Sequence, residues 1–410
     1  MRTNQRLQPL NSRTRHFFQK LAWLLLIVLS TSGGWQSSPW TALGQTSSVR
    51  FTESLKFEEI EPGIEYGQTT SGQASKDELT GPWLISVLRI DPTRAQLKIV
   101  HALDEGVGLE TVSSLAARFG APAATNGGYF RIAGTYRGDS IGLLVLDRSL
   151  ISEPYNERAG FGLIDTGNKT EVVFGHLKFS GEISLGLTKH PVNGLNRPLS
   201  PDELIVFTPK FHRTTLTNPD GIEVVVRRNK VASIGDLKGS SDIPVDGYVI
   251  SAVGKSREWV KVNVRKGARI TFSWQLNSID GDDADWMRAY SMVGGGPQLI
   301  KAGKVAITDK QEKMSAKFAT DRHPRTAIAK LNSGKLLLVT VDGRHPGISV
   351  GLSLYMLADL LLELGAVEAI NLDGGGSTTM VIHNKIVNKP SDQAGERPVS
   401  DAILVFSKPD

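Results

Sequence analysis

The feature that most constrains this chain is a polar, glycine-rich run near its C-terminus, Asn371-Leu-Asp-Gly-Gly-Gly-Ser-Thr-Thr379. It follows the apolar residues 367–370, which predict a buried strand. Three consecutive glycines supply no side-chain packing and cost backbone entropy on folding. Chains keep such loops where the backbone turns sharply or lies close to a ligand. Because Asn371 and Asp373 bring polar groups to the same strand end, the run predicts a functional loop.

Three other segments combine glycine with a predicted strand end. They are Thr125-Asn-Gly-Gly-Tyr-Phe130, Val293-Gly-Gly-Gly-Pro297 and Asp342-Gly-Arg344. Four glycine-bearing loops at strand ends predict one shared pocket at a sheet edge. This is a prediction about architecture, and it names no substrate.

The first 44 residues have the layout of an export signal. They contain five Lys or Arg residues and no carboxylate, and the basic stretch ends at Lys20, just before the apolar run Leu21 to Leu29. Ala42-Leu-Gly44 offers a small-x-small cleavage site, so we expect either a signal peptide removed near Gln45 or an uncleaved N-terminal anchor. We therefore expect an exported body that is periplasmic, secreted or anchored, with membrane contact only through an uncleaved N-terminal segment.

Composition excludes several classes of function. Without the N-terminal segment the chain carries 42 basic and 42 acidic residues, which gives no support for nucleic-acid binding. The absence of cysteine excludes thiol catalysis, thiolate-bound zinc and iron–sulfur clusters. None of the four glycine loops named above ends in Gly-Lys-Ser/Thr, which argues against a Walker-type nucleotide site. We expect no cofactor and no metal, although the acidic loop 278–285 is either a solvated turn or a calcium site without EF-hand spacing.

Short alternating runs dominate the chain from residue 81 to 408, and they predict an α+β fold that is mostly β, with mixed sheets. Residues 45–80 are polar and predict a linker. The short alternating runs of 166–288, among them 261–264, predict strands in an inserted β-rich middle lobe. Only 109–119 and 353–364 have helical periodicity ended by glycine. The second of these lies between two predicted strands, 335–341 and 367–372, in a crossover unit near the C-terminus. Asp342 and Asp373 end these strands, which are expected to be neighbours, and 335–341 is also predicted to form a hairpin with 325–331.

Three carboxylates stand in glycine-flanked, polar surroundings: Asp342, Asp373 and Glu396. Glycoside cleavage commonly uses a proton donor and a second carboxylate as base or nucleophile. Arginine side chains suit phosphate oxygens, and the nearby arginines are Arg325, Arg344 and Arg397. The combination predicts a substrate that is both sugar and phosphate.

A serine–histidine–aspartate triad is a competing arrangement for an enzyme of this sequence. Ser377 would be the nucleophile, with His345 or His383 as the base. The surroundings lack Gly-x-Ser-x-Gly, which weighs against this alternative.

The order of these motifs resembles the phosphodiester glycosidase family. The strings that carry the resemblance are Asn126-Gly-Gly-Tyr-Phe, Arg325-Thr-Ala-Ile, Val341-Asp-Gly-Arg, the leucine-rich helix, the 371–380 run, Val387-Asn-Lys-Pro-Ser-Asp and Glu396-Arg-Pro-Val-Ser-Asp-Ala. They extend from about residue 120 to 407, and the predicted middle lobe carries no matching motif. The resemblance implies hydrolysis of a sugar-1-phosphodiester to the free sugar and a phosphomonoester, with a possible setting in exopolysaccharide or cell-envelope glycan metabolism.

Within these strings we assign roles to the candidate residues. Asp342, Asp373 and Glu396 would be catalytic. The substrate-binding residues would be Asn126, Gly128, Arg325, Arg344, Asn371, Gly374, Gly375, Gly376, Ser377 and Arg397. The partner would be a carbohydrate phosphodiester, and a non-catalytic carbohydrate-binding or polysaccharide-assembly protein that keeps the pocket is the alternative function.

Overall fold

The computed structural model describes residues 50–74, 80–104, 106–281 and 283–409. The predicted export signal and its cleavage site lie outside the described residues. Within those ranges, no helix has the length and apolar character needed to cross a membrane. The fold is α+β and mostly β, as predicted, and antiparallel pairing dominates its four sheets.

The largest sheet has eight strands and carries the candidate site at one end of its central strands. In spatial order it consists of β1 (Glu58–Glu61), β2 (Ile64–Ser71), β3 (Trp83–Ile90), β21 (Leu336–Val341), β20 (Arg325–Leu331), β22 (Ala366–Asn371), β18 (Gln298–Lys301) and β19 (Lys304–Val305). The predicted hairpin of β20 and β21 is confirmed, with Arg325 opposite Val341 in the register.

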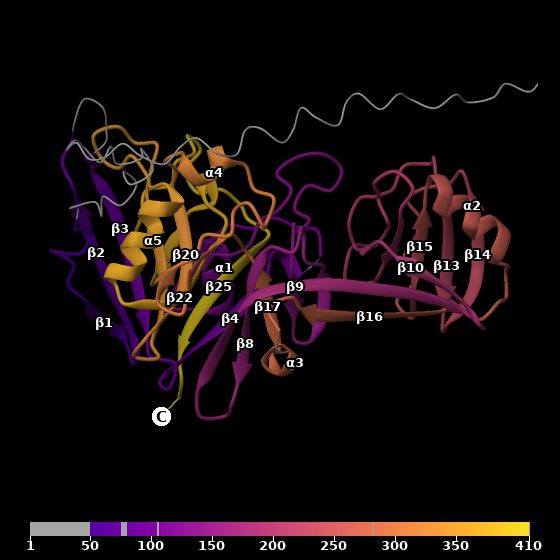
Figure 1. Ribbon diagram of the computed structural model, residues 1–410, viewed down its shortest axis with the longest axis horizontal. Coiled ribbons are helices and arrows are strands. Elements are labelled where there is room, and N and C mark those ends of the chain that lie inside the picture. Colours follow the sequence, from indigo (N-terminus) through magenta and orange to yellow (C-terminus); the bar gives the residue numbers. More distant parts are fainter. Residues whose placement is uncertain (1–49, 75–79, 105, 282, 410) are drawn as a thin grey trace, which may run out of the picture. The chain divides into compact units, whose positions relative to one another are not determined.

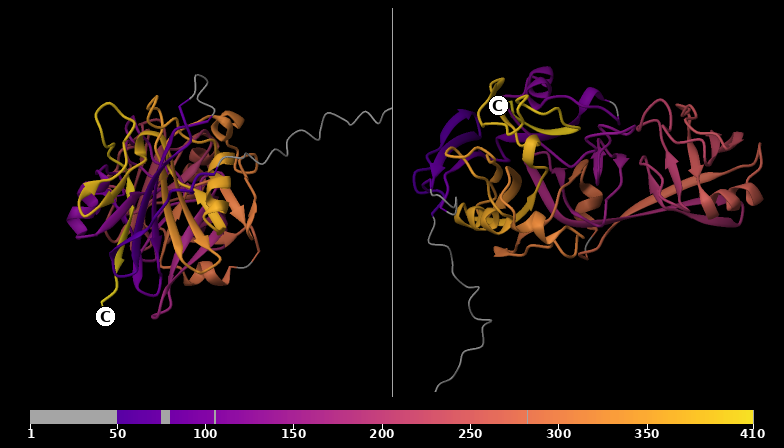
Figure 2. Two further views of the ribbon diagram at one scale, coloured as in Figure 1. Left: turned by 90° about the vertical axis from the view of Figure 1, so that its left-hand side faces the viewer. Right: turned by 90° about the horizontal axis from the view of Figure 1, so that it is seen from above.

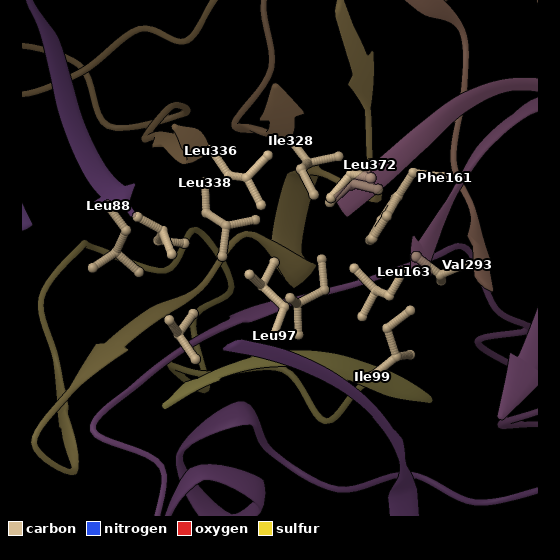
Figure 3. Packing of buried hydrophobic residues seen from close by; sticks show 14 of the residues in the cluster. Leu88, Leu97, Ile99, Phe161, Leu163, Val293, Ile328, Leu336, Leu338 and Leu372 are labelled. Carbon is tan, nitrogen blue, oxygen red and sulfur yellow. The ribbon is translucent and has the colours of Figure 1, made fainter. Parts of the chain in front are cut away.

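Both faces of this sheet are covered by other elements. Successive residues of its strands point to opposite sides and therefore belong to two different apolar cores. One face packs against α5 (Leu354–Glu363), a helix that the leucine spacing predicted and that the Ser353 hydroxyl caps at its N-terminus. The other face meets residues of β4 (Ala95–His101) and β8 (Ala159–Asp165). Figure 3 shows this core, where side chains such as Leu88, Ile328 and Leu338 face Leu97 and Leu163.

Two further sheets complete the body. One contains β24 (Lys385–Ile386), β23 (Met380–Ile382), β5 (Ala123–Asn126), β25 (Asp401–Ser407) and β4, and the predicted helix α1 (Val112–Phe119) packs against it. The other has the order β10 (Thr188–Val192), β9 (Thr170–Leu185), β8, β17 (Ser291–Gly294), β6 (Leu144–Leu146) and β7 (Ser149–Ser152), with β16 (Thr271–Ser278) paired to β9. Short helices α3 (Ala284–Arg288) and α4 (Ala316–Thr320) lie in connecting segments.

The long strands β9 and β16 run together from the body into the middle lobe (Figures 1 and 2). That lobe contains the five-stranded sheet β11 (Gly194–Leu195), β12 (Leu204–Phe207), β15 (Gly247–Ala252), β13 (Ile222–Arg227) and β14 (Lys230–Asp236), with its own apolar core. A β-rich middle lobe was expected from the sequence.

One strand predicted in the lobe is wrong. Residues 261–264 continue and end helix α2 (Gly254–Asn263) instead of forming a strand. Val260 and Val264 are buried whereas Val262 is 68% exposed, which is the i, i+4 pattern of a helix. Because residues 261–264 alternate over only four positions, the sequence pattern resembled a strand and did not reveal the helical period.

The predicted polar linker also differs from the structure. In its described part, β1 and β2 are strands at the edge of the eight-stranded sheet, and Phe51 packs edge-on against Trp83 at 5.3 Å between ring centroids. The composition is polar because an edge strand exposes much of one face, so polarity alone did not distinguish this strand from a linker.

Candidate active site

The site lies where three segments of the eight-stranded sheet meet at the same end of its central strands. Strands β21 and β22 are parallel to each other because both pair antiparallel with β20, which runs between them. The loops after β21 and β22 therefore emerge at this end, together with the start of β20. The sequence predicts that Asp342 and Asp373 end neighbouring strands; instead, β20 separates the two strands and brings Arg325 between the two loops.

A cleft of about 260 Å³ opens at this end of the strands. Seven of its lining residues were predicted from the sequence: Arg325, Arg344, Asp373, Gly374, Gly375, Gly376 and Arg397. Phe318, His323 and Pro324 also line it and were missed. His323 and Pro324 directly precede Arg325, so their place beside a strand-end arginine was the available signal.

Each glycine of the 374–376 loop is required by a close neighbour. A Cβ on Gly376 would lie 2.1 Å from an Arg397 nitrogen, and one on Gly374 would lie 2.7 Å from the Pro324 carbonyl oxygen. Gly375 has a left-handed backbone (φ 62°) and lies under the Arg344 guanidinium. The loop is thus built for close approach of cationic side chains to its backbone.

The predicted amide donors of this loop are only partly available. The Gly374 N–H donates to Asp373 Oδ1 at 2.9 Å, and the Gly375 N–H donates to the Pro324 carbonyl at 2.9 Å. Among the described residues, the Gly376 N–H has no such acceptor, so it is the amide left to meet a ligand.

The three arginines have different surroundings. Arg325 is 1% exposed and donates to the carbonyl oxygens of Leu352, Phe318 and Asp321, each at 2.9 Å. Burial lowers the pKa of Arg325 to about 10, which still leaves it cationic at neutral pH.

Arg344 is exposed and its Nη2 lies 3.3 Å from His323 Nδ1. Burial and the charges of Arg325 and Arg344 lower the pKa of His323, so its ring is neutral and can accept from Arg344. Arg397 forms a two-pronged ion pair with Asp392, with bonds of 2.7 and 2.9 Å. Arg344 is therefore the cation of the cleft that is most accessible to a ligand.

Asp373 is the carboxylate that lines the cleft. Burial raises its pKa to about 6, outweighing the Gly374 N–H and the charge of Arg397, which both favour the ionised form. A carboxyl group with a pKa near 6 can exchange a proton at neutral pH, as a general acid or base must.

Residues behind Asp373 hold it in place rather than face the cleft. The fully buried Asn126 donates to the Asp373 carbonyl at 2.7 Å and accepts from the Thr326 hydroxyl at 2.9 Å. Asn371 donates to the Tyr129 hydroxyl and to the Gly296 carbonyl at 2.8 and 3.0 Å. The predicted sugar-binding asparagines therefore occupy supporting positions in this structure.

The other glycine loops pack against this support. Gly127 accepts from the Asp373 N–H at 3.1 Å, and a Cβ on Gly295 would lie 2.3 Å from the Asn371 carbonyl oxygen. Gly128 donates to Asp401 Oδ1 at 2.7 Å, a buried carboxylate that the sequence analysis did not single out. The four glycine loops do converge, but only 374–376 and Arg344 reach the cleft.

Asp342 lies outside the lining of the cleft. Its two carboxylate oxygens accept from the Asn388 side chain at 2.8 Å and from the Lys389 N–H at 2.7 Å, and burial raises its pKa. Asn388 in turn donates to the Thr378 carbonyl at 3.0 Å. This placement gives Asp342 a role in positioning the loop around 378 and 388, and its catalytic role stays a prediction.

Glu396 and Ser377 also lie away from the cleft lining. Glu396 accepts from the Ser113 N–H and hydroxyl at 2.9 and 2.5 Å, at the N-terminus of α1, where a carboxylate stabilises the helix. Ser377 is fully buried and has no histidine partner. His345 instead contacts the Pro390 carbonyl, and His383 contacts Glu61, so no serine–histidine–aspartate triad is assembled among the described residues.

A chain of charged groups that the sequence did not reveal lies behind the 294–297 loop, with His176 and Glu312 buried and Asp280 at the surface. His176 contacts Asp280 at 2.9 Å and Glu312 at 3.1 Å, and Glu312 also accepts from the Gln298 N–H at 2.9 Å. Burial opposes charge on His176, but the two carboxylates raise its pKa. Asp280 of the predicted acidic loop is thus used internally, and the described residues contain no cluster of side chains that could hold a metal ion.

Comparison with known proteins supports the resemblance drawn from the motifs. Residues 220–406 match the family model described as phosphodiester glycosidase. The resemblance to this family is confirmed over the matched residues. The match begins inside the predicted middle lobe, a hundred residues later than the motifs had indicated.

Two curated relatives match shorter parts of the chain. Human N-acetylglucosamine-1-phosphodiester alpha-N-acetylglucosaminidase is 34% identical over 129 residues, which cover 28% of this chain and 25% of that protein. The SPbeta prophage-derived uncharacterized protein YomE of Bacillus subtilis (strain 168) is 40% identical over 89 residues, which cover 22% of this chain and 13% of that protein. The chain thus spans a quarter or less of the length of these relatives.

A solved structure shares the fold over most of the chain. It is that of a candidate exported protein from Burkholderia pseudomallei K96243, with a TM-score of 0.76 and 23% sequence identity. The match covers 88% of this chain and 97% of that one. At this level of identity the likeness establishes the architecture alone.

Proposed function

We propose that this protein hydrolyses a glycosyl phosphodiester outside the cytoplasmic membrane, releasing the sugar and leaving a phosphomonoester. The observation that carries the proposal is the pairing, in one small cleft, of an Asp373 carboxyl group with a pKa raised to about 6 and three arginines. The family match over residues 220–406 supports the reaction class. The export-like N-terminal segment supports the location.

The bound phosphodiester would place its anionic oxygens among the arginine side chains. Arg344 is accessible for a direct contact, whereas Arg325 and Arg397 are held by other groups and add positive charge at the cleft wall. The Gly376 N–H offers a further donor. Phosphate held in this way leaves as a stabilised anion, so protonation of the leaving oxygen contributes less than in an ordinary glycosidase.

Asp373 would act at the anomeric carbon. As a base it takes a proton from water, the water oxygen bonds to the anomeric carbon, and the bond from that carbon to the phosphate oxygen breaks. The products are the free sugar and a phosphomonoester, which keeps the electron pair of the broken bond. Asp342, Asn126 and Asn371 would keep the loop and Asp373 in register, and Glu396 would stabilise α1.

The test is turnover of a sugar 1-(methyl phosphate), followed by phosphorus NMR in water enriched in oxygen-18. The expected products are free sugar carrying the heavy oxygen and unlabelled methyl phosphate. Formation of sugar 1-phosphate and methanol would contradict the proposed bond cleavage. A folded protein that binds the diester without turnover would instead favour the alternative of a carbohydrate-binding or polysaccharide-assembly protein.

A further inference from the structure

A second and larger cavity lies between the loop 131–136 and the middle lobe. Its volume is about 580 Å³, and its lining shares no residue with the candidate active cleft. Four parts of the lobe contribute to it: the turns 198–202 and 216–220, Ser251 of β15 and the residues 253–254 that begin α2. The proposed hydrolysis uses none of these residues.

The charge of this cavity is opposite to that of the cleft. Among the described residues that line it, Arg131 is the only basic one, and it is already paired with Asp139 at 3.2 Å. Two carboxylates, Asp202 and Asp220, also line it. Asp202 lies 3.9 Å from the Lys255 ammonium, whereas Asp220 has no ion-pair partner among the described residues. Because the described lining holds an unpaired carboxylate and no unpaired cation, a phosphate or another anion is disfavoured here.

Several lining side chains are uncommitted hydrogen-bonding groups. Within the described part of the chain, the side chains of Thr135, Asn218, Asp220 and Ser251 form no hydrogen bonds, although Ser251 is only 1% exposed. Asp202, in contrast, already accepts from the Lys255 N–H at 2.8 Å. The cavity thus offers hydroxyl, amide and carboxylate groups that can both donate to and accept from a polar ligand.

The walls that carry these groups are fixed from behind. The buried Glu223 accepts from the hydroxyls of Thr215 and Thr217 at 2.7 and 2.6 Å and from the Ser241 N–H at 2.8 Å. Tyr136 donates to the Thr215 carbonyl at 3.1 Å and thereby ties the body loop to the lobe. A preformed site loses less conformational entropy on binding a flexible polar ligand.

Apolar surface alternates with the polar groups in the lining, through Leu199, Leu216, Val253 and the prolines Pro198 and Pro201. A neutral sugar presents both kinds of surface, because its hydroxyls need donors and acceptors while its ring C–H faces need apolar contact. A pocket with a few convergent polar groups on an apolar lining is typical of small-molecule sites.

We propose that this cavity binds a neutral oligosaccharide segment. The site is a binding site that is separate from the hydrolytic cleft, and the inference does not depend on turnover at Asp373. The uncommitted Asn218, Asp220, Thr135 and Ser251 side chains would bind sugar hydroxyls, and Leu199 and Leu216 would contact the ring faces.

The test uses an array of neutral and sulfated oligosaccharides with the full chain, followed by calorimetry with the best neutral binder. Two variants alter the cavity: Thr135→Trp fills it from an exposed position, and Asn218→Ala combined with Asp220→Ala removes uncommitted side chains. Ile132→Trp is the matched control, because Ile132 is 65% exposed on the same loop and does not line the cavity.

The expected result is retention of neutral oligosaccharides, with binding weakened about tenfold or more by each cavity variant and unchanged by Ile132→Trp. Inorganic phosphate should not compete. Absence of any neutral binder on the array, or equal binding by Thr135→Trp and Ile132→Trp, would overturn the proposal. Hydrolysis of a small sugar phosphodiester should be the same in all of these variants, which separates this test from that of the active cleft.

Discussion

Two carboxylates in different regions of the molecule have contrasting surroundings. Glu223 in the middle lobe is buried, and both its oxygens accept hydrogen bonds from three donors that it holds in place. Asp373 in the active cleft is partly buried, accepts from the Gly374 N–H, and has a pKa raised to about 6. A fully hydrogen-bonded carboxylate organises structure, whereas one that is desolvated with few donors is suited to move a proton.

The two cavities near these carboxylates differ in the charge of the residues that line them. The smaller cleft is lined by three arginines, and the larger cavity has no unpaired cation among the described residues that line it. The larger volume therefore does not mark the proposed site of hydrolysis. Substitutions in each region can show whether hydrolysis takes place in the cleft and oligosaccharides bind at the lobe.

The largest effect is expected for Asp373→Asn, which keeps the shape of the side chain but cannot accept a proton. Turnover of a sugar phosphodiester should fall by about 10²–10⁴-fold, the usual contribution of general acid–base catalysis. Neutral-oligosaccharide binding should stay unchanged. Asp242→Asn, an exposed carboxylate of the lobe, is the control. Near-native turnover by a folded Asp373→Asn variant would remove Asp373 from the mechanism.

The same substitution should raise stability at alkaline pH. Because the pKa of Asp373 is raised in the folded state, folding favours its protonated form, and that stabilisation is lost as pH rises from about 4 through 6. Asp373→Asn should therefore be more stable than the wild type at pH 8, by up to about 3 kcal/mol, and similar at pH 4. The partial exposure of Asp373 makes this an upper bound. Thermal unfolding at both pH values measures the difference, and a wild type of equal stability at pH 8 would contradict it.

Arg344→Ala should mainly weaken substrate binding. A hydrogen bond to a charged group contributes about 1.5–3 kcal/mol, so we expect KM for a sugar phosphodiester to rise about 10–100-fold. Inhibition by inorganic phosphate should weaken in parallel, while thermal stability changes little because the side chain is exposed. Arg137→Ala, an exposed arginine that lines neither cavity, is the control. If only kcat fell, Arg344 would act in the chemical step instead.

The smallest effect on activity is expected for Glu223→Gln in the lobe. The amide nitrogen cannot accept a hydrogen bond, so one donor is left unpaired at a cost of about 1–3 kcal/mol of stability. Oligosaccharide binding should weaken because the 215–217 wall loosens, while hydrolysis of a small phosphodiester is kept. Glu258→Gln on the exposed surface of the same lobe should leave binding unchanged. Loss of hydrolysis in a folded Glu223→Gln variant would show that the two regions are coupled.

Local signals predicted much of the fold. The hairpin of β20 and β21, the leucine-rich helix α5 and the C-terminal strand β25 follow from periodicity and turn residues that act over a few positions. Helix α2 and the edge strands β1 and β2 were missed, because in each the local composition resembled another structure. Sequence could not show which element would cover or pair with them.

The candidate site was likewise predicted only in part. The sequence identified seven residues that line the cleft, because a triple glycine, a strand-end aspartate and arginines are visible as residue types. It also grouped Asp342, Glu396, Asn126 and Asn371 with them, since their motifs lie in the same family-like strings. The structure turns these four side chains toward hydrogen-bond partners within the protein.

By itself, the sequence determined the fold class, the resemblance to the phosphodiester glycosidases and the loops that would converge. These depend on residue identity and on spacing along the chain. Only the tertiary structure decided which carboxylate reaches the cleft, because strand β20 separates β21 from β22 and the partners of each carboxylate come from distant segments. Burial and hydrogen bonding set the pKa of Asp373 and hold the carboxylate of Asp342. Both effects come from neighbours in three dimensions and not from position in the sequence.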